Sequence, residues 1–492
     1  MSKWVVVGGG ATGMALALAG LDAGQRVLLL EQKHEIGGLT SSIDLQADDI
    51  PVGVDRFYHV ILESDSQVLK LLDRVGMRER VRWASAPASI IANATRYPAT
   101  NLIDMARLPA LALPTRALIG LSIAFSLLLP GFIANRITAQ RWLIATAGRN
   151  AYRNFWAPIL RAKLGNQASR VSAAFLVSTF RRLVRARLSG AGDRFGVLPG
   201  GYAEVFCRIR QQIIDRGGEL RTDAEVSAIA GVTGSGTGGR ICITLANGEQ
   251  LHCDDVFVTA PGPSASALLP QLTADEHHRL TSAPYLGVLC GVFLVRRPPT
   301  DSYITYLVDD IDLTGVIGMH ALLPANLTGG AALIYLPRYC ASDDDWFSLS
   351  DDQVRDRLLT ELGRCLPDYQ PDVLDWAISR APHVVPLPLP HTCKPLPYRT
   401  SVPGVHVVST AQNTSGTLNV ETSLRQAAVA VANCVAQRVV QGVAQSARAH
   451  RGDAGIEQAK ERRRCLAAQG FRQFHAVFTV CTLYVSNWCD SN

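Results

Sequence analysis

The pattern of apolar positions near the amino terminus predicts a β-strand, a turn and a helix in immediate succession. Residues 4–7 form a short apolar run rich in valine, and residues 14–23 form an Ala/Leu-rich stretch typical of a helix. The turn between them is Gly8-Gly9-Gly10-Ala11-Thr12-Gly13, and a second apolar strand is expected over residues 27–30. Because the glycines interrupt the apolar run, the segment does not read as a signal peptide.

This strand, turn and helix have the parts of a dinucleotide-binding unit. Gly8 permits a tight turn, Gly10 lets the backbone approach a pyrophosphate, and Gly13 lets helix and strand pack closely. The pyrophosphate would lie at the amino terminus of the helix, where unpaired N–H groups favour negative charge. Glu31 ends the second strand 18 residues after Gly13, where it would accept hydrogen bonds from ribose hydroxyls and repel a 2′-phosphate. NADP is therefore disfavoured.

The same glycine spacing occurs a second time without this context. Gly234, Gly236 and Gly239 match it, but no helix is predicted after them. Strand-like residues 241–245 and 250–258 instead flank Asn247-Gly248, a typical hairpin turn. The second match is interpreted as a loop before a β-hairpin.

The residues that follow Glu31 carry a family resemblance. Gln32 and four further residues lead to Gly37-Gly38-Leu39-Thr40, and this spacing resembles the amine oxidase, protoporphyrinogen oxidase and phytoene desaturase superfamily of FAD enzymes. Residues 198–226 and 256–261 resemble the family's later passages through the FAD domain, and residues 405–435 resemble its last strand and helix. The resemblance implies an α/β fold with a three-layer, Rossmann-like FAD-binding domain and an interleaved α+β substrate domain.

FAD is the cofactor that the resemblance implies. In the family a Gly-Asp pair usually follows the last strand, whereas this chain has Ser409-Thr410-Ala411-Gln412, where Thr410 or Gln412 would act as neutral hydrogen-bonding groups. The implied cofactor residues are Gly8, Gly10, Ala11, Thr12, Gly13, Glu31, Gln32, Gly37, Gly38, Leu39, Thr40, Val226, Thr410, Thr417, Leu418 and Asn419. No metal site is expected, because the eleven cysteines include no Cys-x-x-Cys and no His/Cys ligand spacing.

The order of these segments predicts two intertwined domains. The FAD-binding domain is assigned residues 1–58, 195–268 and 396–445, and the substrate domain a helical part, 59–194, and a sheet-containing part, 269–395. Ser64 with Gln67, and Ser350 with Gln353, are predicted to form capping boxes at helix starts in these inserts. Residues 446–492 match nothing in the family, and no fold is predicted for them.

Residues 117–134 contain no charged side chain. Eighteen residues is the lower limit for a membrane-spanning helix, and Gly120, Pro130 and Gly131 weaken that interpretation. A buried or substrate-channel helix and a segment that dips into a membrane surface remain as alternatives. Either of the last two suits an apolar or lipid-linked substrate.

Several residues in the substrate half are candidates for chemistry. His59 is the candidate proton donor or flavin contact, because related sugar mutases and oxidases carry a His or aromatic residue there, although a structural histidine is an equal alternative. Tyr58, Arg181, Arg182 and Arg380 are weaker substrate candidates, and His383 is a weaker candidate together with Arg380. The arginines between 181 and 187 are interpreted either as a solvated basic face or as a phosphate or anionic-lipid contact.

Composition narrows the class of protein. The chain has 492 residues, 48% of them hydrophobic, so a large globular core is expected. The formal net charge of +6 is divided equally between residues 1–445 and 446–492, which disfavours a nucleic-acid partner. Scattered cysteines indicate a reduced, cytoplasmic protein, with peripheral contact at the inner face of a membrane through residues 117–134 as a further expectation. The sequence indicates no oligomeric state.

The favoured function is that of an FAD-dependent oxidoreductase. It would transfer a hydride to the flavin from a C–N or C–C bond of a hydrophobic or lipid-linked substrate. A flavin-dependent isomerase similar to UDP-galactopyranose mutase is the first alternative, and it would need paired arginines for a diphosphate. A non-catalytic FAD-binding protein is the second, because the Gly-Asp pair is absent.

Overall fold

The computed structural model describes residues 2–100, 113–188, 194–231, 240–309, 311–390, 394–413 and 419–449. The chain divides into two units, residues 1–427 and 428–492. Helix α13 (Val420–Ala449) begins in the first unit, and its remainder is the described part of the second. Everything below concerns the first unit.

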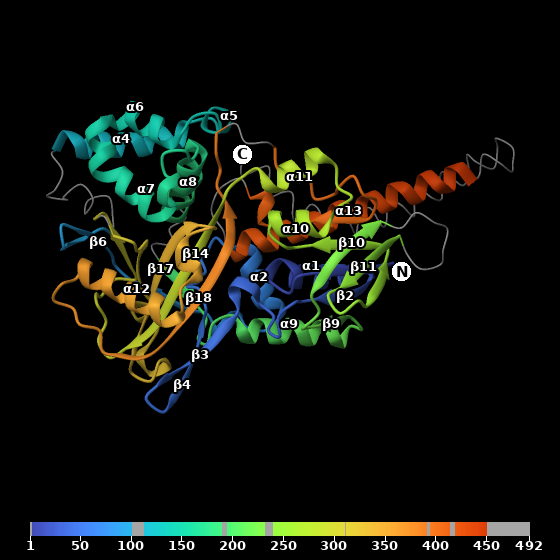
Figure 1. The fold of residues 1–492 in the computed structure, drawn as a ribbon, viewed down its shortest axis with the longest axis horizontal. Helices are drawn as coiled ribbons and strands as arrows, with labels where there is room; N and C mark the ends of the chain where they lie inside the picture. The colour runs from blue at the N-terminus through green and yellow to red at the C-terminus, as the bar shows by residue number, and fades with distance from the viewer. Residues whose placement is uncertain are drawn as a thin grey trace. The chain divides into compact units, whose positions relative to one another are not determined.

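A parallel sheet lies at the centre of one half of the first unit (Figure 1). Within the described residues it has five strands in the order β19 (Val405–Val407), β13 (Asp255–Val258), β1 (Lys3–Val7), β2 (Arg26–Leu30) and β9 (Glu219–Arg221). The register places Val6 beside Leu29 on one side and Phe257 on the other. These strands come from three separate stretches of the chain. The strands β1, β2 and β13 are buried almost throughout, as is typical of a parallel sheet covered on both faces.

Helices cover one face of this sheet and a second sheet covers the other. Trp4 and Val27 pack against Gly20 in α1 (Ala11–Asp22), and α9 (Ala203–Asp215) contacts α1. Val5 and Leu28 point the other way, into a core shared with the antiparallel strands β10 (Val226–Gly231), β11 (Ile241–Leu245) and β12 (Gln250–Cys253). The predicted three-layer α/β arrangement and the hairpin around Asn247-Gly248 are therefore confirmed. Residues 232–239, which carry the second glycine motif, lie outside the described residues.

A mixed sheet forms the other half of the first unit. Among the described residues it has seven strands, β18 (Val373–Pro386), β14 (Tyr285–Val295), β17 (Ala332–Ala341), β16 (Gly315–Gly318), β15 (Ile304–Leu307), β6 (Ala88–Ala92) and β7 (Thr95–Pro98), in that order. Strands β6 and β7 come from the insert that the sequence predicted to be mostly helical. The parallel pairing of β6 with β15 therefore links the two inserts into one sheet.

A lobe of helices packs on this mixed sheet. It contains α4 (Leu113–Leu128), α5 (Gly131–Ala134), α6 (Ala139–Ala151), α7 (Ala157–Leu164) and α8 (Ala173–Leu188), with a π-helical turn at Tyr152–Trp156. Helix α7 contacts β15 and β17, whereas α4 contacts α6 and α8. This lobe is hereafter called the helical lobe. Within the described part of the chain, no helix is long and apolar enough to cross a membrane, so the spanning interpretation of residues 117–134 is wrong.

Shorter elements complete the described fold. Two antiparallel pairs are β3 (Ser42–Ala47) with β4 (Ile50–Asp55) and β5 (Arg82–Ser85) with β8 (Arg194–Val197). The remaining α-helices of the first unit are α2 (Ser66–Arg74), α10 (Gly262–Leu268), α11 (Ala274–Thr281) and α12 (Asp351–Cys365). The capping box predicted at Ser350 and Gln353 opens α12.

The capping box predicted at Ser64 and Gln67 is wrong. Helix α2 begins at Ser66, and the side chain of its N-cap residue, Asp65, makes no capping hydrogen bond. Instead Glu421, 354 positions beyond Gln67, accepts the N–H groups of Gln67 and Val68 at 2.7 and 3.1 Å. A cap supplied from so far along the chain leaves no local sequence signal.

Candidate functional site

The turn between β1 and α1 forms a cradle of glycines. Gly8 has φ +108°, which favours glycine, and its N–H donates to the carbonyl of Leu30 at 2.8 Å. A side chain at Gly13 would place its Cβ 1.8 Å from the Gly8 carbonyl oxygen. The tight turn and the close helix-to-strand packing predicted for these two glycines are therefore present.

Gly10 differs from its neighbours because no described residue of the protein requires it to be a glycine. Its φ of −75° suits any residue, and an added Cβ would meet no described atom closer than 3.8 Å. Gly10 is also the N-cap of α1, where among the described residues no side chain caps the helix. The first N–H groups of α1 are thus available to an anion, and the missing side chain leaves room for one. These features fit a pyrophosphate.

Glu31 lies beside this cradle and organises it. The carboxylate is buried and accepts the Gly9 N–H at 2.6 Å and the Lys33 N–H at 2.9 Å. Each carboxylate oxygen retains a second lone pair, so Glu31 can still accept ribose hydroxyls. The Ala224 N–H donates to the Glu31 carbonyl at 2.9 Å, which brings the segment leading to Val226 next to it.

The second glycine pair closes against the first. The Gly37 N–H donates to the Gly9 carbonyl at 2.9 Å, and Gly38 lies against the backbone of Gly10. Thr40 is buried, and its hydroxyl donates to the Gly37 carbonyl at 2.7 Å. The structure therefore brings together residues from 8 to 40 that the sequence placed at the cofactor. Ala11 and Thr12 are partly exposed in the first turn of α1, Gln32 is exposed, and Leu39 packs on the core of the mixed sheet.

The carboxyl-terminal part of the predicted cofactor site is described only in part. Thr417 and Leu418 lie outside the described residues. Asn419 caps α13, its side chain accepting the Thr422 N–H at 2.8 Å. Ser409 and Gln412 form a reciprocal capping box around Thr410, so the Gln412 side chain is already engaged. The Thr410 hydroxyl oxygen is buried and has no hydrogen-bond partner among the described residues.

A recess lined by both halves of the first unit holds His59. The His59 Nδ1 lies 3.4 Å from Asp55 Oδ2, and its ring meets that of Tyr202 edge-on. Asp55 Oδ1 in turn accepts the Tyr202 N–H at 2.8 Å and the Ser42 hydroxyl at 3.0 Å. A side chain at Gly201 would collide with the Asp55 carboxylate, which requires glycine there. His59 Nδ1 therefore faces the Asp55 carboxylate without a hydrogen bond to it, and Nε2 is on the far side of the ring.

Tyrosines line the mixed sheet next to this recess. The rings of Tyr58 and Tyr335 meet edge-on with centroids 6.1 Å apart, and Tyr339 interacts electrostatically with Tyr58. The Tyr335 hydroxyl donates to the Asp55 carbonyl at 2.6 Å. Burial raises the pKa of Tyr58, Tyr335 and Tyr339, so this group, hereafter the tyrosine wall, stays neutral.

The arginines predicted to meet substrate have structural partners. Arg380, on β18, donates to Asp351 and to the Leu349 carbonyl, which ties β18 to the start of α12. Arg181, on α8, donates to the carbonyls of Leu127 and Leu129 at the end of α4. The side chain of Arg182 lies outside what the structure describes. His383, a further weak candidate, has its ring edge-on to that of Tyr285.

Asp55 is the residue that the sequence analysis overlooked. It stands four positions before His59, but a single Asp-x-x-x-His spacing is too common to identify a pair. The Gly200-Gly201 pair indicates that another part of the chain packs closely against the backbone here, but it does not identify that part. Only the folded chain brings Asp55 against Tyr202, 147 positions away.

The match to a family model decides the family of this chain. The model of the flavin containing amine oxidoreductases matches residues 11–435, which includes the cradle from Ala11 onward, Glu31, the recess and the helix start at Asn419. The chain belongs to this family. A search of curated proteins finds no match.

Several solved structures have a fold similar to that of this chain. Cyclohexylamine oxidase from Brevibacterium oxydans IH-35A superposes with a TM-score of 0.66 at 18% identity, covering 89% of this chain and 99% of that one. Wild-type putrescine oxidase bound to putrescine gives 0.65 at 16% identity, covering 88% and 99%. An oxidoreductase from Methanosarcina mazei gives 0.65 at 17%, covering 86% and 98%. At these identities the likeness concerns the fold: a Rossmann-like domain with a mixed-sheet substrate domain.

Proposed function

We propose that this flavin amine oxidoreductase family member binds FAD and oxidises a C–N or C–C bond of a hydrophobic or lipid-linked substrate by hydride transfer to the flavin. The observation that carries the proposal is the cradle at Gly10. A helix start without a side-chain cap, a glycine that only a ligand would require, and the buried Glu31 beside them are the parts of a dinucleotide site. Membership in a flavin-containing family supports FAD as that dinucleotide.

The residues of the cradle would divide the work of holding the cofactor. The first N–H groups of α1, with the positive end of the helix dipole, would bind the pyrophosphate. Glu31 would hold the adenosine ribose, and its charge would exclude a 2′-phosphate. The start of α13 at Asn419 would place further backbone N–H groups near the flavin ring. The flavin, when bound, supplies the hydride acceptor.

The tyrosine wall and the His59 pair would act on the substrate. Neutral, buried phenols offer an apolar surface with few polar contacts, which suits an uncharged or partly apolar substrate. His59, whose Nδ1 faces Asp55 at 3.4 Å, would present Nε2 to accept or return a proton. Two structural neighbours are named for amine oxidation, putrescine oxidase and cyclohexylamine oxidase, and this favours a C–N bond in an amine as the first substrate class to test.

The first experiment is a flavin spectrum of the purified protein, followed by anaerobic stopped-flow. We expect a yellow protein whose flavin absorbance is bleached when an apolar amine is mixed with it. A colourless protein that cannot be loaded with FAD would contradict the proposal. Turnover of a sugar nucleotide that requires prior reduction of the flavin, with no bleaching by any amine or alkane-like substrate, would instead support the mutase alternative.

A further inference from the structure

Helix α4 presents its apolar side chains outward. Leu118, Leu121, Phe125 and Leu128 recur at helical spacing on its exposed face, and Leu128 is 77% exposed. The buried face carries the hydroxyls: Ser122 and Ser126 have no exposed surface, and Ser126 Oγ accepts the Trp142 indole N–H at 2.9 Å. A helix that packs only on its own protein has the opposite arrangement. The exposed face of α4 therefore lacks its partner among the described residues of this unit.

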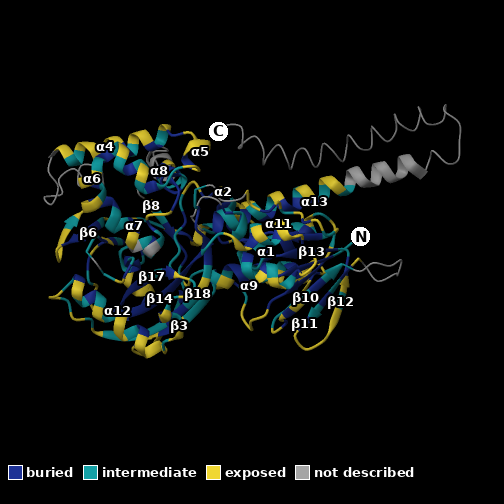
Figure 2. Cartoon of the chain, turned by 45° about the horizontal axis from the view of Figure 1, so that its top comes forward, coloured by how far each residue is buried: buried dark blue, intermediate teal, exposed yellow. Residues whose placement is uncertain are grey.

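Helix α5 extends this exposed apolar surface. It begins at Gly131, two residues after Leu129, and it exposes Phe132 by 68% and Ile133 by 38%. Figure 2 shows exposed positions along both helices. Scattered exposed apolar residues are ordinary, but several large side chains on adjoining helices mark an interaction surface. The side chains of this surface, hereafter the α4–α5 surface, are Leu118, Leu121, Phe125, Leu128, Phe132 and Ile133.

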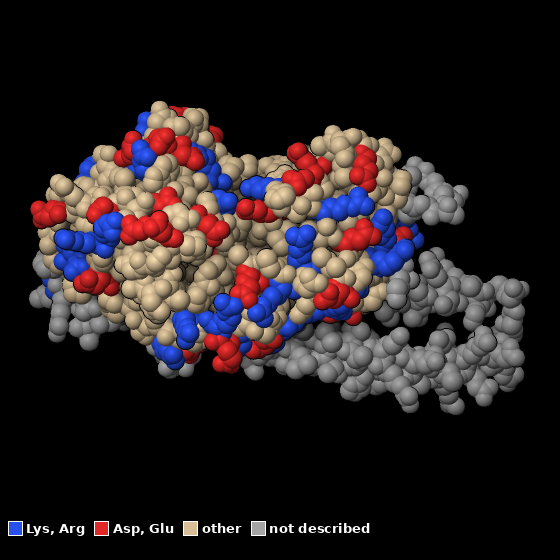
Figure 3. Space-filling view, turned by 90° about the horizontal axis from the view of Figure 1, so that it is seen from below, with Lys and Arg blue, Asp and Glu red and all other residues tan. Residues whose placement is uncertain are grey.

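Charge is segregated along the chain around this surface. Residues 105–192 contain 13 of the 48 Lys and Arg residues and none of the 42 Asp and Glu residues, so this stretch has a formal charge of +13 and the rest of the chain −7. The even balance seen over residues 1–445 concealed this. The face drawn in Figure 3, by contrast, mixes both signs. The helical lobe therefore has no carboxylate of its own, and its partner should be anionic.

Arginines flank the α4–α5 surface, one close to it in sequence and others on helices that pack against α4. Arg136 follows α5 directly and is exposed, and Arg141 is exposed on α6, which packs against α4. Arg181 reaches from α8 to the carbonyls of Leu127 and Leu129, each at 3.2 Å, and so fixes the end of α4. The apolar side chains are thus presented from a supported helix whose neighbours carry positive charge.

We propose that the helical lobe docks on the surface of an anionic lipid bilayer, with the α4–α5 surface inserted at the level of the headgroups. An apolar helix face flanked by arginine is the composition of an interfacial helix. Helix α4 has 16 residues and is about 24 Å long, so it lies along a bilayer and does not cross one. A second copy of the chain is a poorer occupant, because a symmetric contact would oppose two lobes of charge +12. The proposal does not depend on the proposed flavin chemistry.

The test is co-sedimentation of the full chain with two kinds of vesicle. One kind is phosphatidylcholine alone, and in the other a third of the lipid is phosphatidylglycerol. We expect binding to the anionic vesicles and much weaker binding to the neutral ones. The double variant Leu128→Ser, Phe132→Ser should reduce the binding by at least about tenfold, because two large apolar side chains no longer leave water. The double variant Arg136→Glu, Arg141→Glu should also reduce it by at least about tenfold, and in this variant the salt dependence should weaken.

The control replaces two apolar side chains of similar exposure away from the lobe. Ile50→Ser with Ile214→Ser should leave vesicle binding unchanged, since these residues are 52% and 46% exposed on β4 and α9. Circular dichroism and the thermal midpoint of each variant check that it folds. If the wild-type protein does not bind anionic vesicles, the proposal is overturned. A wild-type dimer that Leu128→Ser, Phe132→Ser converts to monomer, with no vesicle binding, also overturns it and assigns the surface to a second copy.

Discussion

Gly10 and Gly13, both within six residues of the end of β1, are glycines for opposite reasons. Gly13 is required by the protein, since a Cβ there would lie 1.8 Å from the Gly8 carbonyl oxygen. No described residue requires glycine at position 10, since a Cβ there would make only ordinary van der Waals contact, 3.8 Å from Gly38 Cα, and its φ is −75°. If a phosphate lies against Gly10, the same chemical change at the two positions should separate folding from cofactor binding.

We predict that Gly10→Ala abolishes FAD binding without unfolding the apoprotein. The new methyl group occupies the approach of the pyrophosphate, while the free energy of unfolding changes by less than about 1 kcal/mol. Gly13→Ala should lower the free energy of unfolding by several kcal/mol, roughly the upper range for point mutations, because helix and strand must move apart. Urea unfolding of the apoprotein measures the free energy of unfolding, and a flavin titration measures FAD binding.

Gly363→Ala is the matched control for these two substitutions. Gly363 lies inside α12, and an added Cβ there would meet nothing within 4 Å. This change should raise stability slightly, by about 0.5–1 kcal/mol, and leave FAD binding alone. A Gly10→Ala protein that binds FAD as tightly as the wild type would show that the phosphate lies elsewhere.

The Asp55 and His59 pair should behave as one unit in catalysis. Asp55→Asn keeps an oxygen for the Tyr202 N–H but removes the charge that faces His59 Nδ1. We predict that Asp55→Asn and His59→Gln each slow flavin reduction by substrate at least about 100-fold, the range for a general acid or base, and that the double variant is no slower than His59→Gln. Stopped-flow absorbance gives the rates, and the bound flavin spectrum checks that the site is intact. Multiplying effects in the double variant would mean that the two residues act separately.

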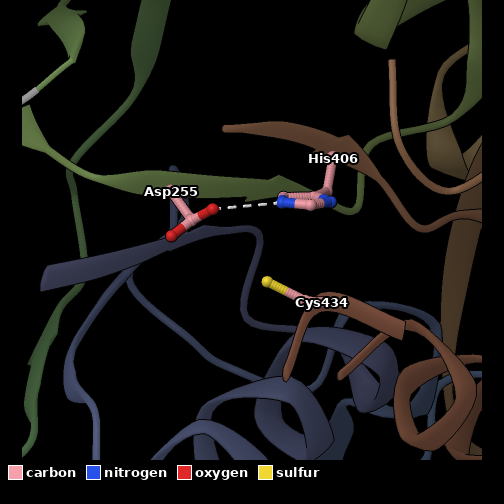
Figure 4. Close-up of side chains that lie close together, drawn as sticks. All are labelled: Asp255, His406 and Cys434. Atoms are coloured by element: carbon pink, nitrogen blue, oxygen red, sulfur yellow. Dashed lines mark hydrogen bonds and ion pairs between the residues drawn. The ribbon is translucent and has the colours of Figure 1, made fainter. Parts of the chain in front are cut away.

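At the scale of elements, β13 and β19 are joined by a buried His–Asp hydrogen bond as well as by backbone bonds. His406 Nε2 on β19 lies 3.3 Å from Asp255 Oδ1 on β13 (Figure 4), and the imidazole stacks on Phe257. Burial, and to a lesser degree the positive Arg399, lowers the pKa of His406 from 6.5 to about 4. Between about pH 4 and pH 6.5, His406 is therefore neutral in the folded chain while the unfolded chain already binds a proton there.

We predict that acid weakens this junction between about pH 6.5 and pH 4. The unfolded state binds the extra proton in that window, so stability falls as the pH falls and the contribution of His406 levels off below about pH 4. A shift of this size corresponds to roughly 3 kcal/mol. Denaturant unfolding at several pH values should show a shallower slope for His406→Gln than for the wild type. Equal slopes would show that other groups control the acid response.

Elements differ in how far their neighbours in sequence determine them. The glycine turn, β1, α1, β2 and the box that caps α12 were predicted because each depends on residues within a few positions. The cap of α2 by Glu421 and the cap of α4 by Arg181 were missed because their partners lie in other elements. Strands β6 and β7 were missed for a related reason. They are short, and their place in the sheet comes from pairing with β15, more than 200 positions away in the chain.

At the scale of the whole molecule, the order of motifs along the chain predicted the architecture better than the composition of the chain did. Three passages of the chain contribute strands to one parallel sheet, because parallel neighbours need long crossover connections and the inserts supply them. The domain boundaries assigned from sequence stay a prediction. The charge segregation was missed because the count over residues 1–445 averaged the helical lobe with an acidic remainder.

An interleaved sheet makes cofactor binding a property of the whole first unit. If FAD contacts the cradle, the segment at Val226 and the start of α13, it joins passages that are far apart in sequence and should stabilise them together. Ligand that binds only the folded state adds roughly 4 kcal/mol at a thousandfold excess over Kd.

We therefore predict that FAD raises the thermal midpoint of wild-type apoprotein in a single cooperative transition, in proportion to the logarithm of its concentration. FMN, which lacks the adenosine that Glu31 would hold, should raise it far less. Gly10→Ala should show no rise with either flavin, although its apoprotein melts with the wild type. Calorimetry measures all three. A rise in which residues 1–58 melt separately from the rest, or an equal rise with FMN, would contradict a dinucleotide held by several passages of the chain.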